Sequence, residues 1–344
     1  MKTDRPLLTI AIPTFNRARF LRELLSILFD QLIAQPRVEL IVSDNASPDE
    51  TPILLQEYQD RGLQVRYIRN KTNIGADANF LQCFELARGK YVWIVGDDDI
   101  IPSGALDRVL YFLDSGDFDL IFLRPMPFDE QPLATYKPDP RGREAFRIRS
   151  ASLFCRMVGI MFTLITCNII NKQRFEKLIP ALDHGLLETN LVQLGWVYPL
   201  VANFAQGLYV FDYLISVRAA NGGGYSVSRV FGKNFKQITD NILGPGSPLA
   251  RAMHQEALSK CLPFLVLEVR QHRFIESKSE DFHATLKPIY GKMGAYWFYV
   301  FPVAACPLWF AGLWYRFIQQ INSVAPALQL LKFYLDRPNK RREW

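Results

Sequence analysis

Short apolar runs alternate with segments of helical length through roughly the first 125 residues of the chain. The apolar runs lie at residues 7–12, 38–43, 65–69, 91–95 and 119–123. The run at 91–95 mixes β-branched and aromatic residues without polar alternation, which is typical of a strand covered on both faces. Strands separated by helices indicate an α/β fold with a mostly parallel sheet and right-handed crossovers.

The segments between the runs carry helix signals of their own. The first has apolar residues on one face over residues 20–32, after Asn16 as the expected N-cap. The second, about residues 49–59, opens with acidic residues that suit the positive end of a helix. The third follows the turn at Asn73 and ends near Gly89. Helices are therefore expected to flank the sheet.

Polar side chains follow each of the first four predicted strands. Because the carboxyl ends of parallel strands meet at one edge of a sheet, these side chains are expected on a common rim, where open α/β sheets bind ligands. They are Thr14 and Asn16, Asp44 and Asn45, Arg69 and Asn73, and Asp97, Asp98 and Asp99. None of them is specific alone, since an Asp after a strand is more often a helix cap.

Three consecutive carboxylates, Asp97, Asp98 and Asp99, are the strongest chemical signal in the chain. Adjacent negative charges repel one another, so we expect a counter-charge beside them. Oxygen-rich sites that bridge to phosphates favour Mg²⁺ or Mn²⁺. Asp97 and Asp99 would point to the same side of an extended segment and form the metal and diphosphate pair. A solvated acidic turn before a helix near Ser103 is the alternative.

Composition describes a globular protein of more than one ordinary domain. The chain has 344 residues, of which 49% are hydrophobic and 22% are charged. The net charge of +6 suits a nucleotide, a nucleic acid or an anionic lipid without choosing among them. Five cysteines without a C-x-x-C pair predict reduced thiols and no zinc site. The run at 7–12 is too short for a signal peptide, so we expect the amino terminus in the cytosol.

Glycine-rich phosphate loops are absent from the sequence. Neither G-x-G-x-x-G after the first strand nor G-x-x-x-x-G-K-[ST] occurs. Dehydrogenases and P-loop nucleotidases are therefore disfavoured.

Four motifs, in order, resemble the nucleotide-binding half of family 2 glycosyltransferases with the GT-A fold. They are Pro13-Thr-Phe-Asn-Arg17, Ser43-Asp-Asn-Ala-Ser47, Asn73 and Gly75 with Asn79, and Gly96-Asp-Asp-Asp99. The resemblance covers about residues 7–125, and within the family the chain looks most like the O-antigen, abequosyltransferase-like enzymes. It implies a metal-dependent inverting transferase that uses a UDP- or dTDP-sugar, with Mn²⁺ or Mg²⁺ as cofactor.

The resemblance also implies roles for single residues. Asp44 would accept the N3–H of a uracil or thymine ring, Arg69 would contact a phosphate or the base, and Asp99 would ligate the metal. The complete set expected to bind the donor is Pro13, Thr14, Asn16, Asp44, Asn45, Arg69, Asn73, Gly75, Asn79, Asp97 and Asp98, with Asp97 and Asp99 as metal ligands.

A general base is expected well past the metal motif, because inverting members of the family use a carboxylate there, often from an acidic pair. Here His184-Gly-Leu-Leu-Glu-Thr189 occupies that region, and Thr189 replaces the second acidic residue. Glu188 is the expected catalytic base, with Asp183 and His184 behind it. Stabilisation of the first turn of the next helix is the alternative role of Glu188.

Three regions are expected along the chain: a nucleotide-sugar-binding half at 1–125, an acceptor-binding half at 126–230 and a helical extension at 231–344. Residues 126–150 are rich in proline and charge and are expected to form an exposed excursion. Its arginines, including Arg141 and Arg143, either meet phosphates of an acceptor or are simply solvated.

An uncharged aromatic stretch at 293–315 marks the helical extension. Its length permits a membrane span, but Pro302 and Pro307 interrupt it, and Trp and Tyr favour the membrane interface. The sequence of this stretch is consistent with three alternatives: an element at the membrane interface, a buried hairpin and a true membrane span. The cationic residues between Lys332 and Arg342 would favour an anionic leaflet.

These inferences predict an inverting glycosyltransferase, peripheral or monotopic at the cytoplasmic face of the inner membrane, that acts in bacterial surface polysaccharide synthesis. Its partners would be a nucleotide-sugar donor, a polyprenyl-diphosphate-linked glycan acceptor and the anionic membrane surface, with no nucleic acid. A sugar-1-phosphate nucleotidyltransferase shares a similar sheet but needs a glycine-rich loop after the first strand. A non-catalytic, membrane-docked carbohydrate-binding or scaffold protein is the third hypothesis.

Overall fold

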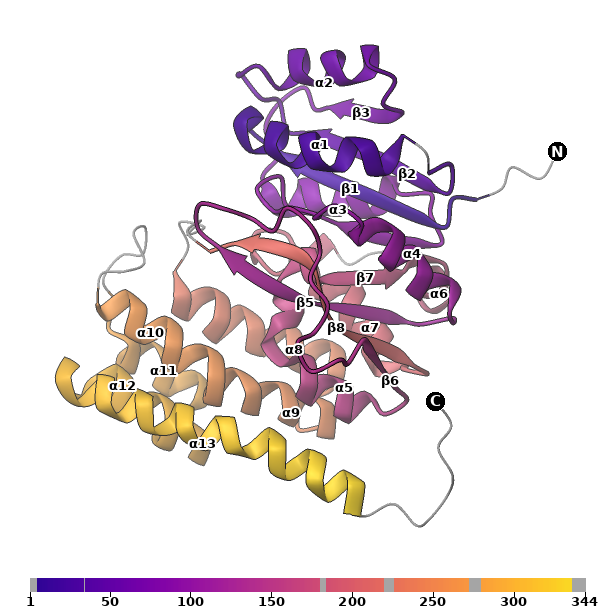
Figure 1. Cartoon of the computed structure of the whole chain (residues 1–344). Helices are drawn as coiled ribbons and strands as arrows, with labels where there is room; N and C mark the ends of the chain where they lie inside the picture. The colour runs from indigo at the N-terminus through magenta and orange to yellow at the C-terminus, as the bar shows by residue number, and fades with distance from the viewer. Residues whose placement is uncertain (1–4, 34, 180–183, 220–225, 272–279, 336–344) are drawn as a thin grey trace. The chain divides into compact units, whose positions relative to one another are not determined.

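The chain divides into two compact units in the computed structural model (Figure 1). The structure describes residues 5–33, 35–179, 184–219, 226–271 and 280–335, with the backbone alone for 323–335. Unit 1 comprises residues 1–221 and 237–252, and unit 2 comprises residues 222–236 and 253–344. The boundary expected after residue 125 falls inside strand β5 (Leu120–Phe128), and unit 1 contains residues 1–125 together with residues 126–221 of the second expected half.

Unit 1 is built on an eight-stranded mixed sheet with the order β3-β2-β1-β4-β7-β5-β8-β6. The strands are β1 Leu8–Thr14, β2 Val38–Asp44, β3 Val65–Arg69, β4 Tyr91–Ile94, β5 Leu120–Phe128, β6 Ala145–Ile148, β7 Asn168–Asn171 and β8 Gly207–Arg218. The first four are parallel, β7 is antiparallel to β4 and β5, and β8 is parallel to β5 but antiparallel to β6. The predicted α/β class with a mostly parallel mixed sheet is confirmed.

Helices of unit 1 flank the sheet and bury apolar side chains against it. They are α1 Ala18–Leu32, α2 Thr51–Asp60, α3 Ala76–Leu86, α4 Ala105–Asp114, α5 Ala151–Val158, α6 Lys172–Leu178 and α7 Leu194–Ala202. One cluster joins leucines of α1, α2 and α4 to the buried residues of β1, β2 and β4. A separate contact places Phe84 of α3 against Phe175 of α6 and stacks it on Trp196 of α7, with ring centroids 4.7 Å apart.

Two helix starts differ from the sequence prediction. The residue that precedes α1 is Arg17, and Asn16 makes no cap, because its φ of 55° turns the backbone before the helix begins. Helix α2 begins at Thr51 without an acidic residue in its first turn. Asp49 instead accepts hydrogen bonds from the backbone N–H groups of Thr51 at 3.1 Å and of Ala18 at 2.8 Å. Asp49 therefore ties the starts of the two helices together.

The segment at 126–150 is more ordered than the predicted excursion. Strand β5 continues to Phe128, because residues 125–128 pair with residues 215–218 of β8. Residues 145–148 then add β6 to the other side of β8. The arginine-bearing loop between these strands therefore lies against the sheet.

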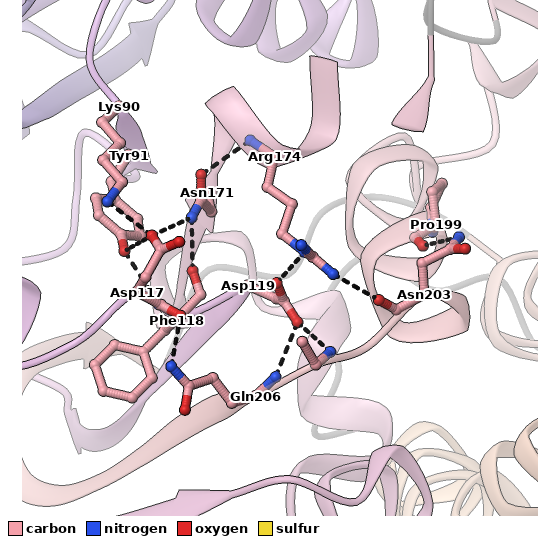
Figure 2. Close-up of polar contacts among 11 residues, drawn as sticks. Lys90, Tyr91, Asp117, Phe118, Asp119, Asn171, Arg174, Pro199, Asn203 and Gln206 are labelled. Atoms are coloured by element: carbon pink, nitrogen blue, oxygen red, sulfur yellow. Dashed lines mark hydrogen bonds and ion pairs between the residues drawn. The ribbon is translucent and has the colours of Figure 1, made fainter. Parts of the chain in front are cut away.

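A polar network fastens the strands at the end where β5 begins (Figure 2). The carboxylate of Asp119 accepts the backbone N–H groups of Ala205 at 2.6 Å and Gln206 at 3.0 Å, and it pairs with Arg174. The side chain of Asn171 donates to the carbonyl of Phe118 at 2.8 Å. Since the triplet 97–99 follows the carboxyl end of β4, this network stabilises the opposite edge of the sheet.

Unit 2 is helical. Its segments include α10 Leu262–Arg270, α11 Phe282–Tyr290, α12 Phe301–Ala305 and α13 Leu308–Leu335, while α8 Phe235–Leu243 and α9 Pro248–Glu256 contribute to both units. The aromatic stretch 293–315 forms a π-helical segment at 296–300, then α12 and the beginning of α13. Tyr296 and Val300 are buried in the core of unit 2, whereas Trp297 and Trp309 are exposed. Among the residues described, no helix combines the length and apolarity needed to cross a membrane.

Candidate active site

The ends of β1, β2 and β4 meet at one rim of the sheet, as predicted. Thr14 at the end of β1 lies in register with Asp44 at the end of β2. The hydroxyl of Thr14 donates a 2.7 Å hydrogen bond to the carboxylate of Asp97, which follows β4. The polar residues after these three strands therefore share one site.

Arg17 supplies the expected counter-charge for the acidic triplet. Its guanidinium lies 3.3 Å from the carboxylate of Asp97 and 3.2 Å from that of Asp98. Asp97 and Asp99 are buried, which excludes the solvated acidic turn. The extended geometry predicted for the triplet is wrong, because the N–H of Asp99 donates to the carbonyl of Gly96 at 3.1 Å and closes a turn. Asp97 and Asp99 consequently have different partners.

Asp99 is held from the side of the sheet formed by β7 and β8. Its carboxylate accepts the hydroxyl of Thr166 at 2.5 Å and the backbone N–H of Arg218 at 3.0 Å. Thr166 in turn accepts the N–H of Gly96 at 3.0 Å. A Cβ on Gly96 would lie 3.0 Å from carboxylate oxygens of both Asp98 and Asp99, so any larger residue here would displace these carboxylates slightly.

Burial raises the pKa of both outer carboxyls of the triplet. The pKa of Asp97 rises to about 6, because desolvation outweighs the Thr14 hydrogen bond and the charge of Arg17. The pKa of Asp99 rises to about 7, because desolvation is reinforced by the negative charge of Asp98. Burial therefore disfavours the charged forms of both carboxyls, and a bound cation would stabilise those charged forms.

The carboxylates of the triplet fit a divalent cation whose remaining ligands are substrate phosphates and water. Within the described part of the chain, no group of three or more His, Cys, Asp or Glu side chains is placed to hold an ion by itself. Mg²⁺ typically keeps several waters and binds through one or two carboxylates together with substrate phosphates. Asp97 and Asp99 offer carboxylates of this kind, and their hydrogen bonds leave lone pairs on the oxygens.

Asp44 organises the rim at β2 and β3. It has 0% exposed surface, and its carboxylate accepts the N–H of Ser47 at 2.8 Å and the hydroxyl of Tyr67 at 2.7 Å. Arg69 lies 3.4 Å from the same carboxylate and donates to the carbonyl of Ser47 at 2.9 Å, while half of its side chain is exposed. Arg69 is thus the accessible group here, and the base contact predicted for Asp44 stays a prediction.

Asparagines shape the loop between β3 and α3. The side chain of Asn45 donates to that of Asn73 at 2.7 Å and accepts the N–H of Ile74 at 2.9 Å. Gly75 has a φ of 89°, which favours glycine, and directly precedes α3. The buried side chain of Asn79 bonds both the hydroxyl and the carbonyl of Ser43. Asn45 and Asn79 therefore support the loop from beneath it.

Backbone strain concentrates at the predicted site loops. In the described residues, the non-glycine positions with positive φ are Asn16 (55°), Ala46 (66°), Glu188 (65°) and Asn190 (59°). Asn16 donates its N–H to the hydroxyl of Ser47 at 2.9 Å, which joins the loops after β1 and β2. Non-glycine residues held in this conformation cluster at functional sites in many proteins.

The loop with the predicted base is fastened to the start of α3. Asp77, in the first turn of α3, is buried and accepts the N–H of Asn190 at 2.8 Å, together with N–H groups at 188, 189 and 192. Glu188 itself is exposed. His184 lies on the same loop, 3.8 Å from Glu85 of α3. Asp183 lies outside the described residues.

Sequence reasoning missed several residues of this site. Thr166 and Asp77 carry no motif, and their roles depend on contacts across more than 60 positions of the chain. Arg17 belongs to the motif after β1, and its positive charge was the signal that could have identified it as the counter-charge of the triplet. The guanidinium of Arg218 is held by Glu23 at 2.6 Å, so this side chain stabilises the rim.

Comparisons with known proteins agree with this geometry. Residues 9–179 match the model of Glycosyl transferase family 2. Abequosyltransferase RfbV of Salmonella typhimurium is 37% identical over 110 residues, which are 32% of this chain and 33% of that protein. GalNAc(5)-diNAcBac-PP-undecaprenol beta-1,3-glucosyltransferase of Campylobacter jejuni is 30% identical over 112 residues, 32% of this chain and 36% of that protein. These matches span about a third of each relative.

Solved structures with a similar fold cover most of the chain. TarS of S. aureus (residues 1–349), in complex with UDP, has a TM-score of 0.62 at 17% identity and covers 92% of this chain and 91% of its own. Mannosyltransferase PcManGT from Pyrobaculum calidifontis, in complex with GDP-Man and Mn2+, has a TM-score of 0.53 at 14% identity, covering 91% and 88%. Through its residues 9–179, the chain is a member of glycosyltransferase family 2 with a GT-A fold.

Proposed function

We propose that this protein is an inverting glycosyltransferase that moves a sugar from a UDP- or dTDP-sugar to a lipid-linked glycan in bacterial surface polysaccharide synthesis. The observation that carries the proposal is the convergence of Thr14, Arg17, Asp97 and Asp99 at the carboxyl ends of β1 and β4. One relative, the GalNAc(5)-diNAcBac-PP-undecaprenol beta-1,3-glucosyltransferase, supports the lipid-linked acceptor, and TuaG of Bacillus subtilis, named for teichuronic acid biosynthesis, supports surface polysaccharide synthesis.

The donor nucleotide would occupy the rim between the ends of β1 and β3. Arg69 is its accessible cation, and Asp44 holds Arg69 and Tyr67 in place. Asp97 and Asp99 would hold Mn²⁺ or Mg²⁺. Such an ion stabilises the negative charge that develops on a departing diphosphate. The support for this assignment is the burial of both carboxyls, which raises their pKa values by desolvation, beside the guanidinium of Arg17.

The transfer itself is a single displacement at the anomeric carbon. An oxygen of the acceptor bonds to this carbon while the bond to the diphosphate breaks, and the diphosphate keeps the electron pair. The proton of the acceptor hydroxyl passes to the carboxylate of Glu188, acting as general base. Glu188 suits this role because it is exposed, while Asp77 holds its loop by the backbone.

Unit 2 would bring the enzyme to its lipid-linked acceptor. Trp309, Leu313 and Phe317 of α13 follow one another at four-residue spacing, which places them on one face of the helix. Their exposed fractions are 70%, 56% and 46%. A row of large apolar side chains including Trp suits the interface of a bilayer. We propose that this row docks peripherally on the anionic cytoplasmic face of the inner membrane.

Isothermal titration of UDP and dTDP, with and without Mn²⁺, tests the donor site. We expect the nucleotide to bind in a Mn²⁺-dependent manner. Asp99→Ala should abolish this binding, and it should also abolish sugar transfer from every member of a panel of nucleotide-sugars to a polyprenyl-linked acceptor. Glu188→Ala should retain nucleotide binding and lose turnover. Absence of nucleotide binding by the unaltered protein would refute the transferase, and an active Glu188→Ala enzyme would refute the assignment of the base.

A further inference from the structure

A cavity of about 510 Å³ lies in unit 1 on the part of the sheet formed by β5 and β8. Its walls include Arg124 of β5, Arg141 and Arg143 of the loop before β6, and the aromatic residues Tyr209, Phe211 and Tyr213 of β8. None of these residues takes part in the contacts of the acidic triplet. The cavity is large enough for a small-molecule ligand, for which sites of roughly 300 to 1,000 Å³ are usual.

A bulge in β8 and a hydrogen-bonded loop form the cavity. Leu123 pairs with Val210, but Pro125 pairs with Ile215, so residues 211–214 bulge out of the regular pairing. The loop before β6 is bound to this bulge, because Tyr213 and Lys137 exchange backbone hydrogen bonds of 2.8 and 3.4 Å. The N–H of Phe211 also donates to the carbonyl of Glu144 at 2.9 Å. The walls are therefore held by main-chain contacts on both sides.

Buried Asp139 fixes two of the arginines. Its carboxylate lies 3.2 Å from the guanidinium of Arg124 and 2.9 Å from that of Arg143. These guanidiniums stack on rings of β8: Arg124 lies 4.6 Å from the ring centroid of Tyr213, and Arg143 lies 4.2 Å from that of Phe211. Their side chains are still 35% and 38% exposed, so each has surface left for a ligand.

Positive charge is in excess in the cavity. Three arginines face one carboxylate, that of Asp139. The side chain of Arg141 is exposed and forms no ion pair with any residue that the structure describes. An arginine with a fixed plane recognises a carboxylate or phosphate through paired N–H donors. The cavity thus offers anion-binding guanidiniums beside half-buried aromatic side chains, and the ring surface that the guanidiniums leave uncovered can pack against a sugar ring.

We propose that this cavity binds an anionic saccharide, meaning a sugar that carries a carboxylate or a phosphate. Free phosphate alone would leave the aromatic wall and most of the volume unused. A neutral sugar would leave the excess arginine charge without a partner. The choice of a saccharide rests on the proposed transfer reaction, for which the cavity provides a second sugar subsite that can hold an acidic part of the glycan.

Saturation-transfer NMR with glucuronate, glucose 1-phosphate, glucose and inorganic phosphate tests the proposal on the full chain. Glucuronate carries a carboxylate and glucose 1-phosphate carries a phosphate, so comparing them shows which of the two groups the cavity prefers. We expect at least one of them to bind about tenfold more tightly than both glucose and inorganic phosphate. Equal binding of all four probes, or no binding of either anionic sugar, would overturn the proposal.

Arg141→Glu locates the binding, with Arg149→Glu as a matched control that makes the same charge change at an exposed arginine outside the cavity walls. We expect Arg141→Glu to weaken the anionic sugar about tenfold or more and Arg149→Glu to leave it unchanged. Equal effects of the two variants, or displacement of the sugar by UDP with Mn²⁺, would contradict a separate site. Because UDP titration is measured on the same samples, a failure of the donor site is distinguished from a failure of this cavity.

Discussion

The buried carboxylate of Asp77 is expected to control turnover without touching the donor. It accepts the N–H of Asn190 at 2.8 Å and further N–H groups of the loop that carries Glu188. Glu188 and Asn190 both have positive φ, a conformation that costs of order 1–3 kcal/mol for a non-glycine residue. The hydrogen bonds to Asp77 therefore hold the loop against its own backbone preference.

Asp77→Asn tests this role with little change of shape. The new amide keeps one acceptor oxygen but places an NH₂ group against backbone N–H donors. A buried donor left without a partner costs about 1–3 kcal/mol. A loss of about 2 kcal/mol corresponds to a roughly thirtyfold change in the equilibrium between the held and the released loop. We expect kcat to fall, by at most about thirtyfold, with the Kd for UDP and Mn²⁺ unchanged.

Initial rates of nucleotide release measure kcat, and titration of UDP with Mn²⁺ measures donor binding on the same samples. Asp60→Asn is the matched control, because Asp60 is an exposed carboxylate at the end of α2, and it should behave as the unaltered enzyme. Unchanged kcat in Asp77→Asn would refute the reasoning. A parallel loss of UDP binding and thermal stability would instead assign Asp77 to the fold alone.

Three further predictions concern the triplet and unit 2. Gly96→Ala should weaken Mn²⁺-dependent UDP binding about tenfold by titration, because the added Cβ would lie 3.0 Å from two carboxylate oxygens; unchanged affinity would contradict this geometry. The folded-state pKa values of Asp97 and Asp99 are raised to about 6 and about 7, so the metal-free protein should lose stability as pH rises from about 4 through 7. Thermal melts should show the Tm falling over this pH range. The fall should be smaller in Asp99→Asn, and Mn²⁺ should raise the Tm at pH 8; an equal fall in the variant would refute the assignment of this pH dependence to Asp99. Trp309→Asp should reduce sedimentation with anionic vesicles, whereas Ile53→Asp, at an exposed apolar position of unit 1, should not; equal sedimentation of the two variants would exclude the row on α13.

The first five strands and the identity of the rim were accessible from local patterns. Apolar runs at 7–12 and 91–95 indicated buried strands, and parallel strands must end at a common edge, so the meeting of Thr14 with Asp97 could be predicted. The need for a counter-charge followed from Coulomb repulsion alone. Its source, Arg17, depended on the course of the chain between β1 and α1.

The prediction failed where a side chain's environment is set by distant segments. An extended triplet was expected from the spacing of Asp97 and Asp99, but a turn closes there. The loop at 126–150 was expected to be exposed because it is polar. Most of its residues from 129 to 144 are exposed, but the bulge of β8 provides backbone partners that also fasten the loop to the sheet.

By itself, the sequence determined the α/β class, the acidic cluster after β4 and the family, because these depend on local periodicity and on motifs contiguous in the chain. Only the tertiary structure decided that Thr166 holds Asp99, that Asp77 fastens the loop of Glu188, and that arginines and aromatic residues enclose a cavity on β8. The physical reason is that burial and hydrogen-bond partners come from segments far apart in the chain, and no local pattern encodes which of them will meet.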